Sequence, residues 1–117
     1  MDFEFSFKYT EQDILRMEVS PNERIKGDLN LLSEWLISDV SIGTTTLPKV
    51  KEVLEGSGTK KAKLWGNAFI AMVKKDYTTI KWAVLHKNTY CKLPTEMLYA
   101  ILKIWVKEFE KDWKKRN

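Results

Sequence analysis

Strict alternation of aromatic and polar residues near the start of the chain is the strongest constraint on its fold. Four aromatic side chains fall on one side of an extended segment: Phe3, Phe5, Phe7 and Tyr9. Successive side chains of a strand point to opposite faces, so this pattern predicts a half-buried β-strand. The segment 13–19 alternates again after a short polar break. Residues 3–19 are therefore predicted to form a β-hairpin.

A second hairpin is predicted in the other half of the chain. Residues 62–73 form an apolar and aromatic run, and residues 77–85 form a β-branched and aromatic run. The three residues 74–76 separate the runs as a short turn, although they lack the glycine that hairpin turns favour. Gly66 inside the first run indicates a bulge or a close approach of another backbone.

Three helices are predicted from capping residues and apolar spacing. Ser20 and Pro21 resemble a helix start, but Gly27 weakens the first turns and favours a beginning near Asp28. Thr46 is expected to cap a second, short helix that ends before Gly56. The last helix is the longest.

That last helix opens at residues 94–96 and carries a broad apolar stripe. The resulting element order is ββ-αα-ββ-α. We expect one α+β domain over residues 1–117, with an antiparallel sheet formed from two β-hairpins and helices packed against it.

Charge is distributed unevenly along the chain. Residues 1–58 have a net charge of −5 and residues 59–117 a net charge of +9, within a total of +4. Unless the halves interleave in space, such a chain has an electrostatic dipole that orients charged partners.

Residues with the usual chemistry of active sites are scarce. His86 is the single histidine and Cys91 the single cysteine, and no glycine-rich phosphate loop is present. We expect both residues to be structural, with no catalytic site, no metal and no cofactor. The acidic start and the lack of a long apolar run predict a cytoplasmic protein that does not span a membrane.

Basic residues interleaved with aromatic ones mark the second hairpin as a candidate binding surface. The lysines are Lys60, Lys61, Lys63, Lys74, Lys75, Lys81 and Lys87, and the aromatic residues are Trp65, Phe69, Tyr77 and Trp82. This combination is typical of single-strand or RNA binding, through phosphate neutralisation and base stacking. A solvated face that only keeps the domain in solution is the simpler alternative.

The acidic half offers a second candidate surface. Asp28, Glu34 and Asp39 are expected on or beside the first helix, where they would meet a basic protein surface. An ordinary solvated helix face is again the simpler interpretation.

Several short sequence segments resemble those of the small YacL-type bacterial proteins, which are α+β proteins. The resemblance is carried by residues 1–5, residues 28–32, Trp65 with Gly66, and the closing amphipathic helix. Those proteins are acidic overall, whereas the second half of this chain is basic. The shared residues imply no catalytic role.

A resemblance of a more general kind leads to the functional hypothesis. Small, tryptophan-rich chains without catalytic residues are similar to the immunity proteins of bacterial contact-dependent growth inhibition systems, which bind and block a toxin nuclease domain. The resemblance implies an intracellular protein whose partner is a toxin. The alternative is a nucleic-acid-binding or regulatory module that uses the basic half, and an enzyme is the least supported class.

Overall fold

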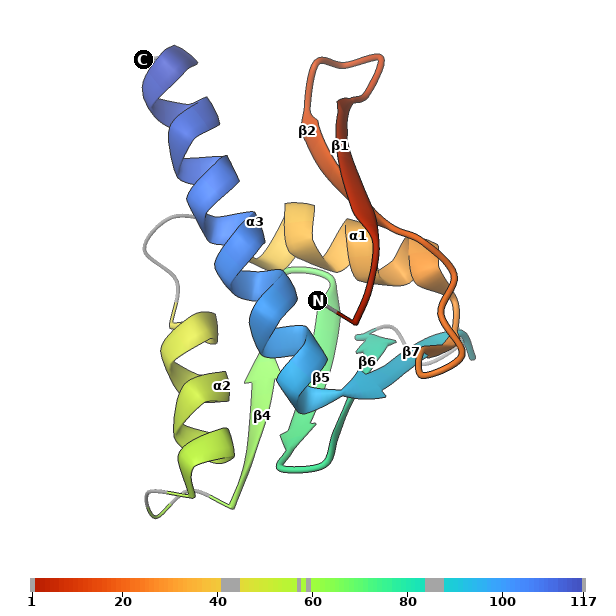
Figure 1. Cartoon of the computed structure of the whole chain (residues 1–117), viewed down its shortest axis with the longest axis vertical. Helices are drawn as coiled ribbons and strands as arrows, with labels where there is room; N and C mark the ends of the chain where they lie inside the picture. Colours follow the sequence, from red (N-terminus) through yellow and green to blue (C-terminus); the bar gives the residue numbers. More distant parts are fainter. Residues whose placement is uncertain (1, 41–44, 57, 59, 84–87, 117) are drawn as a thin grey trace.

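The structure, a computed structural model, describes residues 2–40, 45–56, 58, 60–83 and 88–116. Its elements follow the chain as β1 (Phe5–Tyr9), β2 (Leu15–Val19), β3 (Lys26–Gly27), α1 (Leu29–Asp39), α2 (Thr46–Glu55), β4 (Lys61–Trp65), β5 (Phe69–Lys74), β6 (Tyr77–Trp82), β7 (Tyr90–Pro94) and α3 (Thr95–Arg116). The α+β class and the underlying ββ-αα-ββ-α order are confirmed (Figure 1).

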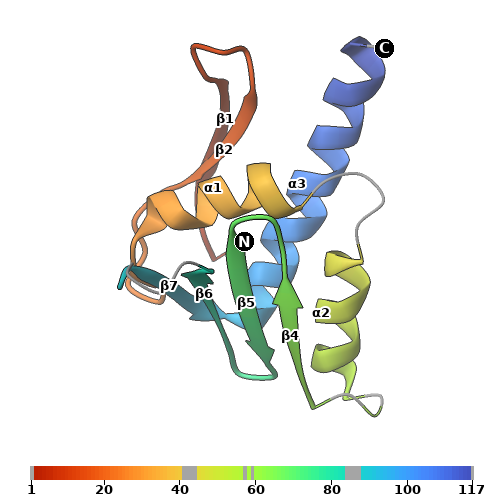
Figure 2. The same ribbon diagram turned by 180° about the vertical axis from the view of Figure 1, so that it is seen from behind.

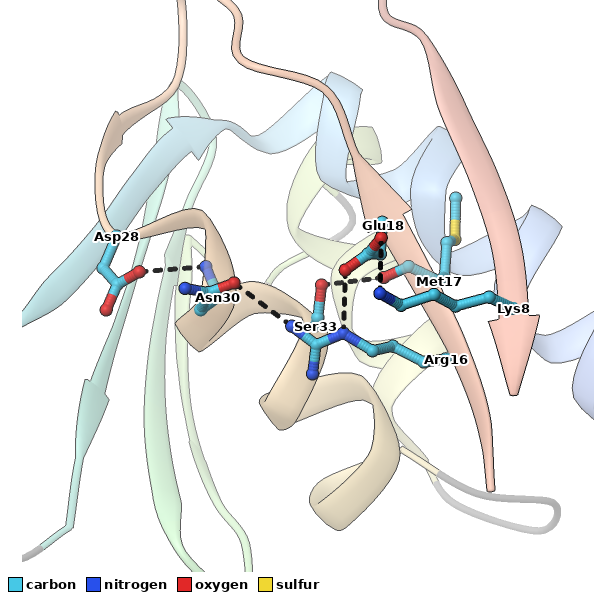
Figure 3. Close-up of polar contacts among 7 residues, drawn as sticks. All are labelled: Lys8, Arg16, Met17, Glu18, Asp28, Asn30 and Ser33. Carbon is cyan, nitrogen blue, oxygen red and sulfur yellow. Dashed lines mark hydrogen bonds and ion pairs between the residues drawn. The ribbon is translucent and has the colours of Figure 1, made fainter. Parts of the chain in front are cut away.

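The first predicted hairpin is confirmed and forms a sheet of its own. β1 and β2 pair antiparallel from Phe5 opposite Val19 to Tyr9 opposite Leu15. The inward side chains of β2 are buried against α1, and the Ser33 hydroxyl on α1 donates to the Met17 carbonyl at 2.7 Å (Figure 3). This bond and the apolar contacts fix the hairpin to α1.

Charged side chains continue the contact between the hairpin and α1. Arg16 donates to Asn30 and to Glu18, each at 3.2 Å, and Lys8 lies 3.2 Å from the other Glu18 oxygen (Figure 3). Lys8 and Arg16 together hold the pKa of the Glu18 carboxyl below its ordinary value. These charged groups are partly exposed to solvent. Their ion pairs therefore orient the hairpin on α1 but add little to the free energy of unfolding.

Helix α1 begins near Asp28, as its sequence favoured, rather than at Ser20. The Asp28 side chain accepts a hydrogen bond from the Asn30 amide at 2.9 Å and so caps the helix. The two residues before it form β3, which pairs with β7. Gly27 adopts φ 91°, and a β-carbon there would lie 2.1 Å from the Tyr90 carbonyl oxygen. Only glycine fits this close approach.

The five-stranded antiparallel sheet has the order β3-β7-β6-β5-β4. The predicted single strand over 62–73 is wrong, since the chain reverses after Gly66 and makes β4 and β5 from the run. A close approach does occur at Gly66, but by a side chain and not by the predicted backbone: a β-carbon there would lie 2.0 Å from an Asp39 carboxylate oxygen. Residues 90–94, for which no strand was predicted, form β7 and include Cys91.

Asp39, the last residue of α1, stabilises the β4–β5 turn. Its carboxylate accepts hydrogen bonds from the backbone amides of Asn67 (2.9 Å), Ala68 (3.3 Å) and Phe69 (3.1 Å). A carboxylate at a helix C-terminus opposes the helix dipole, so its place here is explained by the turn that it satisfies.

The three helices cover one face of the five-stranded sheet. α1 contacts β6 and β7, α2 contacts β4 and β5, and α3 contacts β6 and β7. α3 lies in front of the strands in Figure 1, and the strands lie in front of α3 in the reverse view of Figure 2. Trp105 of α3 is fully buried and donates its indole N–H to the Val40 carbonyl at 2.8 Å. This bond links the end of α1 to the centre of α3.

The two charged halves of the chain interleave at the tip of the hairpin. The Tyr9 hydroxyl donates to Asp112 at 2.7 Å, and the Arg116 guanidinium pairs with both Asp112 (2.9 Å) and Asp13 (3.1 Å). The negative hairpin and the positive end of α3 thus neutralise one another locally.

We predict that Asp39→Ala lowers the free energy of unfolding by about 3 kcal/mol, because three backbone amides lose a charged acceptor. Urea unfolding monitored by circular dichroism measures the change. The matched control is Glu34→Ala on the exposed side of the same helix, which should change stability by less than about 0.5 kcal/mol. Equal midpoints for the two variants would contradict this role of Asp39.

Candidate binding face

The face of the five-stranded sheet away from the helices is lined by lysine and aromatic side chains. We call it the basic face and define it by the outward residues of its strands: Lys26, Lys61, Lys63, Trp65, Ile70, Met72, Lys74, Tyr77, Thr79, Lys81, Tyr90 and Lys92. All twelve are exposed or half-buried, whereas the residues between them on the central strands are buried. No Asp or Glu occupies an outward position on these strands.

Strand register places the apolar residues at the centre of the basic face and the lysines around them. Met72 lies opposite Lys63 on one side and Thr79 on the other. Ile70 lies opposite Trp65 and Lys81 in the neighbouring row. The face therefore has an apolar centre and a cationic surround.

The six lysines of the basic face carry uncompensated charge. Within the part of the chain that the structure describes, none of them forms an ion pair with a carboxylate; the ion pairs lie elsewhere, on the first hairpin, at Arg24 and along α3. Two of them lie over aromatic rings instead, Lys63 at 4.6 Å from the centre of Trp65 and Lys92 at 5.1 Å from the centre of Tyr77. An anionic partner would find these charges available.

A hollow of about 630 Å³ opens on the basic face. The residues that line it include the apolar Ile70 and Met72, several lysines and one acidic residue, Asp76. Beside it, Trp65 is 66% exposed, the largest value for an apolar side chain among the described residues. A concave apolar centre with charged walls is suited to receive a protruding group of a partner.

The predicted basic residues come together in the structure. Lys61 and Lys74 face each other on the basic face, while Lys60 and Lys75 are exposed at its border, before β4 and in the β5–β6 turn. Lys87 lies outside the described residues. Of the predicted aromatic residues, Phe69 is buried on the covered side. Trp82 packs on Phe69 with the ring centres 4.5 Å apart and is also among the residues that line the hollow.

The predicted acidic residues do not form one surface. Asp28 caps the start of α1 and Asp39 holds the β4–β5 turn at its end, so both carboxylates are engaged within the fold. Glu34 is exposed on the same helix, between them. Their common surface, expected to face a basic protein, is not supported by this arrangement.

Among the basic and aromatic members of the basic face, sequence reasoning missed three: Lys26, Tyr90 and Lys92. They lie on β3 and β7, which were not predicted. The alternation of exposed Tyr90 and Lys92 with buried Cys91 and Leu93 is the pattern that would have revealed β7.

The two other residues considered for catalysis are His86 and Cys91. His86 lies outside the described residues. Burial, reinforced by the negative charge of Asp28, raises the pKa of the Cys91 thiol to about 12, so the thiol is protonated at neutral pH. Among the described residues, no three of His, Cys, Asp and Glu gather where they could hold a metal ion.

Comparison of the chain with protein-family models, with curated proteins and with solved structures finds no match. None of the described helices is both long enough and apolar enough to cross a membrane.

The Cys91 thiol should make stability depend on pH in the alkaline range. The folded state keeps this thiol protonated, so the free energy of unfolding should fall as pH rises from about 8.5, the ordinary thiol value, toward about 12. Urea midpoints measured across this range should fall more steeply for the wild type than for Cys91→Ala. Parallel curves for the two proteins would contradict the raised pKa.

Proposed function

We propose that this protein is a non-catalytic binding protein whose working surface is the basic face. The observation that carries the proposal is the cationic surround of an apolar, concave centre on a sheet that is rigidly backed by three helices. A surface already formed in the free protein binds without an ordering cost.

The partner that suits this surface best is a protein with acidic groups around its own binding site. Protein interfaces commonly have an apolar centre and a polar rim, and the basic face has this arrangement in Ile70 and Met72 with lysines around them. The centre would bury apolar groups of the partner, and the lysines would speed and orient the encounter.

Within this class, we propose an immunity protein that binds and neutralises a bacterial toxin nuclease domain. Many nuclease sites contain carboxylates that hold metal ions or move protons. Lysines set against those carboxylates would cover the active site, and the block would be steric and electrostatic. This version replaces the acidic surface of α1 with the basic face as the part that meets the toxin.

The proposal predicts a tight one-to-one complex with a toxin nuclease domain encoded beside the gene for this chain, with loss of nuclease activity. Lys63→Glu with Lys81→Glu should weaken that complex about 100-fold, because both lysines flank the apolar centre. Calorimetry measures the affinity, and cleavage of a labelled nucleic acid measures inhibition.

The matched control is Lys103→Glu with Lys107→Glu, which changes the net charge equally but lies on exposed positions of α3, on the other side of the sheet. It should bind almost as the wild type does. If every candidate toxin domain remains fully active in the presence of this protein, the immunity proposal fails.

A second candidate function is single-stranded nucleic-acid binding, favoured by the three exposed rings among the lysines. Trp65, Tyr77 and Tyr90 are 66%, 49% and 42% exposed and stand on three different strands. Exposed rings of this kind stack on bases while lysines neutralise phosphates.

This second function predicts affinity for single-stranded RNA or DNA oligonucleotides that falls steeply with salt. Changing Lys60, Lys61, Lys74 and Lys75 to Glu should abolish the binding and flatten its salt dependence. Fluorescence anisotropy at low and moderate salt measures both effects. Binding that is unchanged in this variant would exclude the function, and a complex confined to a protein partner would favour immunity.

A further inference from the structure

β4 forms one edge of the five-stranded sheet. It pairs with β5 alone, and its other side has no strand in the described part of the chain. α2 contacts both β4 and β5, and in both views it lies beside β4 on the side away from β5 (Figures 1 and 2). The edge is thus backed by a helix and not closed by a hydrogen-bonded neighbour.

A hydrogen bond in the β4–β5 turn shows which residues of β4 point their backbone N–H and C=O groups toward β5 and which point them away. The Gly66 amide donates to the Phe69 carbonyl at 3.0 Å, so Gly66 is a residue whose polar backbone groups point toward β5. In an antiparallel pair, such residues alternate with residues that point their backbone groups away. Lys61, Lys63 and Trp65 therefore direct their N–H and C=O groups to the outer edge.

These backbone groups have no partner among the described residues, since no hydrogen bond outside the β4–β5 pair reaches the three residues. An unpaired row of this kind is a template for another strand. The side chains of the same residues lie on the basic face. An added strand would extend that face by one strand.

The side chains of β4 select which strand can be added. A second copy of β4, paired antiparallel over the full strand, would place Lys63 directly opposite Lys63, which is unfavourable for directly opposed pairs. A strand with acidic residues at alternate positions would meet both lysines with opposite charge. Trp65, 66% exposed at the end of the strand, offers an apolar surface to a neighbouring side chain.

We propose that an extended acidic segment of the partner protein adds antiparallel to the outer edge of β4. The inference rests on the proposed function, because it identifies which part of a toxin nuclease domain this protein holds. Backbone hydrogen bonds to Lys61, Lys63 and Trp65 give affinity, and alternate carboxylates give selectivity.

A short peptide with Glu at every second position and Thr between them is the probe. Amide hydrogen exchange, followed by NMR on the whole chain, should slow about tenfold or more at Lys61, Lys63 and Trp65 when the peptide is saturating. A peptide with Lys in place of each Glu should leave these amides unchanged. Protection that appears on Lys81 and Lys92 and not on β4 would overturn strand addition.

A second peptide removes the backbone donors and keeps the charges. N-methylation of the amides that would face β4 should reduce affinity about tenfold or more, because each methyl group deletes a hydrogen bond and blocks close approach. Equal affinity of the methylated and unmethylated peptides would overturn the proposal and indicate binding by charge alone.

Lys63→Pro tests the same edge from the side of the protein. The Lys63 amide points outward, so proline there deletes no bond to β5 and is tolerated in an edge strand. Peptide binding should be lost in Lys63→Pro and largely kept in Lys63→Ala. Equal peptide binding by the two folded variants would overturn strand addition. The proposed function fails on a different result, the absence of any complex with toxin nuclease domains.

Discussion

The carboxylate of Asp39 is the contact on which the large sheet depends. It joins the end of α1 to the amides of residues 67–69, where the chain reverses between β4 and β5. Without this reversal there is no β4, and the basic face loses Lys61, Lys63 and Trp65. An acidic residue that seemed suited to a partner thus serves to build the surface that the basic residues occupy.

Local sequence patterns were sufficient to predict the elements whose structure depends on residues adjacent in the chain. The aromatic alternation of the first hairpin, the cap at Asp28 and the opening of α3 at Thr95 are all readable from a few adjacent positions. The β4–β5 turn is different, because its acceptor lies 28 residues away from Asn67 in the chain. The one local signal of this turn is the Gly66-Asn67 pair, which is typical of hairpin turns but was interpreted as a feature within a single strand.

The residues of the basic face could likewise be predicted only where their strands have a clear local pattern. Lysines on the predicted second hairpin were found, because that hairpin was recognised. Those on β3 and β7 were not, since β3 has two residues and β7 runs directly into α3 through Pro94. For the predicted acidic surface, the hydrogen bonds that Asp28 and Asp39 accept from backbone amides were not foreseen; that of Asp39 joins residues 28 positions apart and has no local signal.

The contacts between the β1–β2 hairpin and the end of α3 have a consequence for the order in which the chain folds. Tyr9 and Asp112 are separated by 103 positions, as are Asp13 and Arg116. Such distant contacts close late, after nearer ones have ordered the chain. During synthesis, β1 and β2 leave the ribosome before any other described element, yet they wait for the last turn of α3 to complete their contacts. The hairpin is thus fixed first to α1, which follows it closely in the chain, and gains its contacts with α3 only at the end of synthesis.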